Sequence, residues 1–213
     1  TQLSECIKQA ESWPNSLSLQ WIYGEKIFAH AIGEVKDTDQ EARLINLLSK
    51  LPYECNRRIN KVKDMNSLPA LSIGNYKNND SNHSEIIGLL GPAWKDQNLR
   101  VLKIIKDLIN KRPNKSCYIA SQQLGGLTHL KDHDTSFVHR DAMWKPWING
   151  AWKSQDQSKR KKALKWMEAS WNNLEFICPG VHLAQVHPHL PWHQKELSLA
   201  FKDWLPTLKE IKA

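Results

Sequence analysis

The chain has 213 residues, of which 40% are hydrophobic and 24% are charged, as is ordinary for a globular protein. This length allows one good-sized domain or two small ones. No apolar run reaches the roughly 18 residues that a membrane-spanning helix needs, and no signal segment opens the chain. Because the sequence starts at Thr1 and stops at Ala213 within a helical pattern, we expect a fragment of a longer protein.

The net charge is +8, and a basic balance can indicate nucleic-acid binding. The one dense basic run, at 159–162, lies on an expected helix, where such a run is more typical of a solvated face than of a binding patch. The cysteines at 6, 55, 117 and 178 are far apart and form no CxxC pair. This spacing argues against a zinc knuckle and indicates reduced thiols, so we expect a cytoplasmic protein.

The first third of the chain predicts a helix, a hairpin and a second helix. Residues 4–13 fit a short helix that ends before Pro14. Alternation over 16–23 and 27–35, with a turn between them, predicts two antiparallel strands. Thr38-Asp39-Gln40-Glu41 matches the capping box, and the apolar stripe that follows predicts a helix that stops at Pro52.

The remainder predicts further helices and strands. Residues 53–76 are irregular and 75–84 fit a surface loop. An amphipathic helix is expected over 99–109, a strand over 116–124, a helix over 154–174, a strand over 181–187 and a helix over 193–203. A last helix starts near Leu205, with Pro206 in its first turn. Together these elements predict a single α+β domain over 1–213, an antiparallel sheet with helices packed on one face.

The other sheet face is then free to meet a partner or a ligand. The stretch from Gln122 to Trp152 is the best candidate for a pocket wall, because a strand ends there in Gln122 and Gln123 and the chain resumes with aromatic residues and His139-Arg140. A plain hairpin with a turn at Gly125-Gly126 is the alternative, and short turn signals alone favour it. On the first interpretation, strands 116–124, 134–142 and 181–187 line the pocket.

Two segments carry a family resemblance. Gly125-Gly126, followed by Asp134-Thr135-Ser136-Phe137 and His139-Arg140-Asp141-Ala142, resembles the berberine bridge enzyme-like flavin oxidases, with Ser136 and Val138 as departures. Residues 203–212 resemble the closing helix of that family. The resemblance implies the substrate-binding domain of an FAD-dependent oxidoreductase. That domain covers the flavin and binds a small-molecule substrate. The FAD is held by an N-terminal domain of the parent protein, which is absent from this sequence. No GxGxxG phosphate loop occurs among the nine glycines.

The resemblance also bears on the catalytic base. In the family a tyrosine often removes the proton, and its position here falls on Leu183, which cannot act as a base. Gln185 would keep the amide of that motif. His182 and His187 are candidates to replace the tyrosine, since imidazole titrates near neutral pH, but the alternative, that both are ordinary, partly exposed histidines, is favoured.

The substrate-binding candidates are Gln122, His139, Arg140, Gln185 and Trp144. His139 and Arg140 could fix an anionic or carbonyl group, or Arg140 could pair with Asp141. Trp144, Trp147 and Trp152 could stack on a substrate or belong to the core.

A zinc site and a nucleic-acid-binding module are the two alternatives to a flavin oxidase. His187, His189 and His193 have a spacing that suggests zinc, but prolines interrupt it and no carboxylate is near in sequence, so we expect no metal site. The alternative function is a stand-alone basic module that binds nucleic acid or an anionic partner through residues 159–162. We regard nucleic acid as the less expected partner.

Overall fold

A computed structural model describes residues 2–52, 59–63, 65–67, 83–130 and 135–212 of the protein. It contains one antiparallel sheet with the strand order β2-β1-β4-β5-β3-β6. The strands are β1 (Leu17–Tyr23), β2 (Ile27–Gly33), β3 (His83–Leu90), β4 (Tyr118–Gln123), β5 (Trp144–Trp152) and β6 (Gly180–His182).

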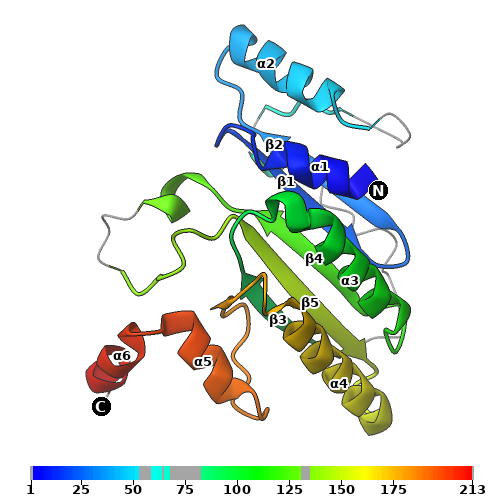
Figure 1. The fold of residues 1–213 in the computed structure, drawn as a ribbon, viewed down its shortest axis with the longest axis vertical. Coiled ribbons are helices and arrows are strands. Elements are labelled where there is room, and N and C mark those ends of the chain that lie inside the picture. Colours follow the sequence, from blue (N-terminus) through cyan, green and yellow to red (C-terminus); the bar gives the residue numbers. More distant parts are fainter. Residues whose placement is uncertain (1, 53–58, 64, 68–82, 131–134, 213) are drawn as a thin grey trace.

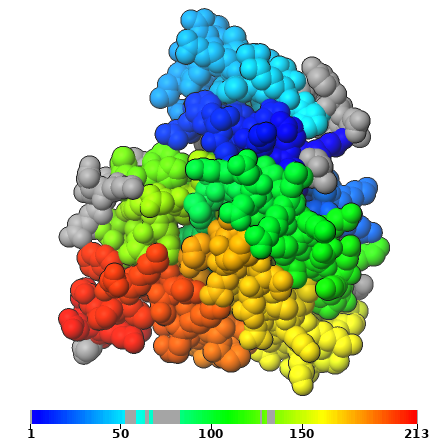
Figure 2. Space-filling view, in the orientation of Figure 1, coloured from blue at the N-terminus to red at the C-terminus, as the bar shows by residue number. Residues whose placement is uncertain are grey.

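Three helices cover one face of the sheet: α1 (Gln2–Ala10), α3 (Asn98–Asn110) and α4 (Gln157–Leu174) (Figure 1). Figure 2 shows the same face as a closed surface on which these helices lie next to one another. The helix α2 (Thr38–Ser49) lies beyond the β2 edge, and α5 (His193–Phe201) and α6 (Trp204–Lys212) lie near the opposite end of the molecule (Figure 1). Short 3-10 turns occur at Met65–Ser67, Lys95–Gln97 and Gly126–His129. The predicted α+β class, with helices on one face, is confirmed.

The core between sheet and helices is built around tryptophans. The ring of Trp94 lies 5.9 Å from that of Trp21 and 5.5 Å from that of Trp144, and all three side chains are buried. The carboxylate of Glu11 accepts hydrogen bonds from the backbone N–H groups of Trp94 and Lys95, and from the indole Nε1 of Trp144 at 2.7 Å. One acid therefore fixes the end of α1 against the chain that leads into α3.

The start of α2 differs from the capping box expected at Thr38. The N-cap is Asp37, whose extended backbone lets its carboxylate accept the N–H of Gln40 at 2.7 Å. The side chain of Gln40 reaches back and accepts the N–H of Lys36 at 2.8 Å. The cap therefore lies one residue earlier than predicted, because aspartate caps as well as threonine and Thr38 is already helical, and the return bond of Gln40 goes to the residue before the N-cap.

Two predicted strands are wrong in position. Of residues 134–142, those described form no strand, and the strand of this region, β5, begins at Trp144. The strand expected over 181–187 ends at His182, after which a tight turn forms, with the N–H of Ala184 bonded to the carbonyl of His182 at 2.8 Å. The strand β3 was not predicted, and its first two residues fall in the expected loop 75–84. The rest of that loop and most of residues 53–76 lie outside the described residues.

No helix in the described part of the chain is long and apolar enough to cross a membrane. Cys6, Cys117 and Cys178 are free thiols.

Candidate functional site

A pocket lies on the sheet face opposite α1, α3 and α4. Side chains alternate along a strand, so on β5 Trp144 and Ile148 are buried towards the helices while Lys145 and Trp147 point to the other face. Gln122 on β4 pairs with Lys145 in the register, and Gly88 on β3 pairs with Trp147. These positions form one concave pocket of about 210 Å³, lined by Ile86, Gly88, Gln122, Lys145, Trp147, His182 and Ala184.

The hollow exists because the central position of the surface is a glycine. Gly88 pairs with Trp147 on one side and with His182 on the other, so no side chain fills the space between the indole and the imidazole. A Cβ atom at position 88 would lie only 2.5 Å from the backbone oxygen of His182. A larger residue there would therefore displace β6 as well as fill the pocket.

Lys145 is the only charged side chain that lines the pocket among the described residues. Burial lowers the pKa of its ammonium, and no carboxylate in the described part of the chain offsets this cost. Its Nζ atom lies 5.9 Å from the centre of the Trp147 ring, within reach of a cation–π attraction. The pocket thus contains a positive charge without a negative partner.

His182 lies at the end of β6 with one ring nitrogen unsatisfied. Burial, together with the positive charge of Lys145, holds the pKa of His182 below its ordinary value of 6.5, so the imidazole is neutral at neutral pH. Its Nδ1 atom is buried and has no hydrogen-bond partner among the described residues. A neutral imidazole that lines a pocket can accept a proton or bind a polar group.

The two glutamine candidates have different places. Gln122 lines the pocket, as expected for a polar residue on the open face of β4. Gln185 does not line it. Its Oε1 atom accepts the backbone N–H of Ile86 at 2.7 Å, and this side chain continues the hydrogen bonding of β3 beyond the end of β6. Leu183, where the resemblance places the family's tyrosine, packs against the hydrophobic core.

His139 lies next to β6 but outside the pocket lining. Its ring packs on Gly180, where an added Cβ would approach within 2.5 Å of the imidazole, and its Nε2 lies 2.7 Å from the carbonyl of Leu199 on α5. Burial lowers the pKa of His139. The ring of His139 therefore joins the segment before β5 to β6 and α5. Its contact on β6, Gly180, lies two residues before His182.

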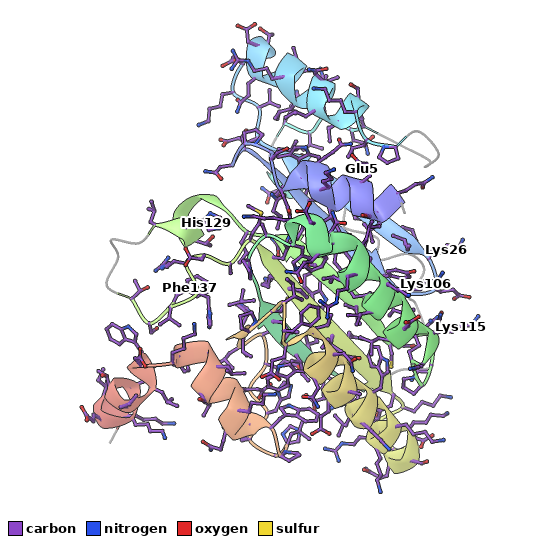
Figure 3. All side chains as sticks on the ribbon, viewed as in Figure 1. Glu5, Lys26, Lys106, Lys115, His129 and Phe137 are labelled. Carbon is purple, nitrogen blue, oxygen red and sulfur yellow. The ribbon has the colours of Figure 1, made fainter. Side chains whose placement is uncertain are left out.

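Arg140 contacts its own loop. Its guanidinium donates to the hydroxyl of Thr135 and to the carbonyl of Thr128, and lies 5.0 Å from the centre of the Phe137 ring. Figure 3 shows His129 and Phe137 on this connection between β4 and β5, away from α3 and α4. These contacts shape the loop.

Trp144 and His187 lie on the helix side of the sheet, away from the pocket. Trp144 belongs to the tryptophan core described above. His187 is fully buried, with Nδ1 2.6 Å from Oε1 of Glu196 and Nε2 3.2 Å from Oε2 of Glu85. Its contacts join the segment after β6 to β3 and α5.

The histidines at 187, 189 and 193 do have carboxylate neighbours, contrary to the expectation from local sequence. Glu85 comes from β3, and His189 lies 3.1 Å from its Oε1 atom; Glu196 lies on α5. Within the described residues no group of three or more histidine, cysteine or acidic side chains has a geometry that could hold a metal ion.

The basic run at 159–162 lies on the first turns of α4, on the helix-covered side of the sheet. Lys159 pairs with the N-cap residue Asp156 at 3.3 Å, and Lys161 and Lys162 are exposed. The run is a solvated helix face.

Lys145 and Gly88 line the pocket but were not predicted from the sequence. Strand β5 was not predicted because Pro146, with Lys145 and Trp147 on either side of it, breaks the regular alternation of apolar and polar residues. With β5 placed, the period of two would have put Lys145 and Trp147 on the face opposite the core residue Trp144.

Comparisons with known proteins identify the fold. No family model matches the sequence, and neither does any curated protein. Among solved structures, a variant of BBE-like 1 from Physcomitrella patens matches with a TM-score of 0.76 at 12% identity, over 99% of this chain and 47% of that one. CrmK, a flavoenzyme of caerulomycin biosynthesis, matches with a TM-score of 0.67 at 15% identity, over 99% and 48%. The 6-hydroxy-D-nicotine oxidase from Arthrobacter nicotinovorans matches with a TM-score of 0.66 at 15% identity, over 97% and 46%.

The chain therefore has the fold of about half of each of these proteins, and the fold expected from the resemblance is confirmed. The chain spans less than half the length of the matched structures. None of the matches named here is a nucleic-acid-binding protein by its description.

Proposed function

We propose that the chain is the substrate-binding domain of a larger FAD-dependent oxidoreductase. In this proposal FAD is held mainly by a further domain of the same protein, and the pocket on the open sheet face covers the flavin and binds a small molecule to be oxidised. The observation that carries the proposal is the position of this pocket, on the face that the helices leave free, in a fold shared with half of several flavoenzymes. The resemblance of residues 125–142 to the berberine bridge enzyme-like oxidases supports it.

The described residues fit one side of a flavin site. The imidazole of His182, the ammonium of Lys145 and the amide of Gln122 are polar groups that line the pocket on the open sheet face. No GxGxxG loop is present to hold a pyrophosphate, so the pyrophosphate would be bound elsewhere in the protein. The chemistry that FAD supplies when bound is the acceptance of a hydride.

His182 is the group that we assign to proton transfer. The neutral imidazole accepts a proton from the substrate hydroxyl or amine at a ring nitrogen, and the nearby charge of Lys145 keeps it neutral until then. Gln122 orients the substrate through its amide, and Trp147 with Ile86 forms an apolar wall that excludes water. His139 packs on Gly180 and so supports β6 next to His182, whereas Arg140 only shapes its own loop. A cytoplasmic location remains a prediction.

The test uses the whole product of the gene. Its reading frame is extended on both sides of the 213 codons, and the purified product is compared with the 213-residue chain. We expect the full product to carry reducible flavin and the 213-residue chain to be colourless. A His182→Gln variant should keep the flavin spectrum and lose oxidase turnover. A full product without flavin would overturn the proposal.

A further inference from the structure

The charge balance of the pocket narrows the class of substrate. Lys145 contributes one positive charge, and no aspartate or glutamate among the described residues lines the surface. A half-buried ammonium without a counter-ion is unfavourable, so a ligand that supplies one negative charge gains more here than a neutral ligand of the same shape. The lining therefore selects for a single anionic group.

The other lining residues indicate what carries the charge. The imidazole of His182 and the amide of Gln122 both line the pocket and can bond to oxygen atoms near Lys145. Trp147 and Ile86 offer a flat aromatic face and an aliphatic surface, which suit an apolar body rather than a free inorganic ion. One cation with two neutral polar groups matches the charge and size of a carboxylate better than those of a phosphate dianion.

We propose that the substrate of this pocket is an aromatic or otherwise apolar carboxylic acid, whose carboxylate is bound by Lys145. That the bound acid is a substrate rests on the proposed function. That an acid binds here rests on the geometry of the pocket alone. The assignment makes Lys145 the residue that determines specificity, while His182 remains the proton acceptor.

Binding of the carboxylate also prepares His182 for its role. The positive charge of Lys145 contributes to the low pKa of His182, and a carboxylate on Lys145 cancels this repulsion. The pKa of His182 then rises towards its ordinary value, nearer to neutral pH, where an imidazole is an efficient base. A substrate without the anionic group would leave the base weaker.

The test is an NMR titration of the 213-residue chain with benzoate, benzamide and inorganic phosphate. We expect benzoate to shift the resonances of His182, Lys145 and Trp147, to raise the pKa of His182 and to bind about tenfold or more tightly than benzamide. Phosphate should bind more weakly than benzoate.

A Lys145→Met variant should bind benzoate about tenfold or more weakly, whereas Lys106→Met, which removes an exposed charge on α3 (Figure 3), should bind it unchanged. Equal binding of benzoate and benzamide, tighter binding of phosphate or equal loss in both variants would overturn the proposal. Such a result with a flavin-containing full product would leave the proposed function intact. If benzoate binds as expected but the full product contains no flavin, the proposed function is wrong and the acid-binding site still stands.

Discussion

Replacing His187 with alanine should destabilise the protein far more than the same change at His189, although both imidazoles contact Glu85. The side chain of His187 is fully buried between Glu85 at 3.2 Å and Glu196 at 2.6 Å. Its removal opens a cavity, takes from Glu196 its contact at 2.6 Å and leaves Glu85 with the more exposed His83 and His189. Loss of one member of a buried charged pair typically costs about 3–5 kcal/mol. The side chain of His189 is 48% exposed, and its contact with Glu85 should contribute about 0–1 kcal/mol.

The assay is urea unfolding of both variants at pH 7, followed by tryptophan fluorescence and circular dichroism, with the free energy of unfolding extrapolated to water. We expect His187→Ala to lower that free energy by about 3 kcal/mol or more, and His189→Ala to lower it by less than about 1 kcal/mol. A similar loss for both variants, or a small loss for His187→Ala, would refute the assignment of His187 as the link between β3 and α5.

Three further predictions concern other parts of the molecule. Glu11→Gln should lower the free energy of unfolding by about 1–3 kcal/mol, because the new amide N–H₂ would face a backbone or indole N–H donor. As a control, Glu5→Gln on the exposed side of α1 should leave that free energy nearly unchanged in the same assay. EDTA should leave the melting temperature unchanged, because the histidines and carboxylates of the described residues form no metal site; a large drop that zinc reverses would contradict this. Lys145→Met should raise the pKa of His182 measured by NMR, yet leave it below 6.5, because burial is the larger cause of the shift; an unchanged pKa would show that the two groups do not interact.

Much of the architecture could be predicted from local sequence. The helices α3 and α4 follow apolar stripes, and the hairpin of β1 and β2 follows clear alternation, because each element buries one side against the sheet or the helices. The break between α5 and α6 follows from Pro206 near the start of a helix. In these elements the burial pattern and the local propensities agree.

The errors arose where a contact distant in sequence replaces a local rule. The alternation of residues 181–187 continues past the end of β6, but there the side chain of Gln185, not the backbone, bonds to Ile86. His187 resembled a pocket histidine because its carboxylate partner Glu85 comes from another strand. The pocket itself combines β3, β4, β5 and β6, so Lys145 could be placed in it only after the register of the sheet was known.

Lysine acetylation can show whether the open sheet face covers a flavin-bearing part of the same protein. The reactivity of Lys145 is measured by mass spectrometry in the 213-residue chain and in the full gene product, with Lys106 on the helix-covered face as the internal reference. We expect Lys145 to react in the 213-residue chain and to be strongly protected in the full product, while Lys106 reacts equally in both. Equal reactivity of Lys145 in the two proteins would contradict it.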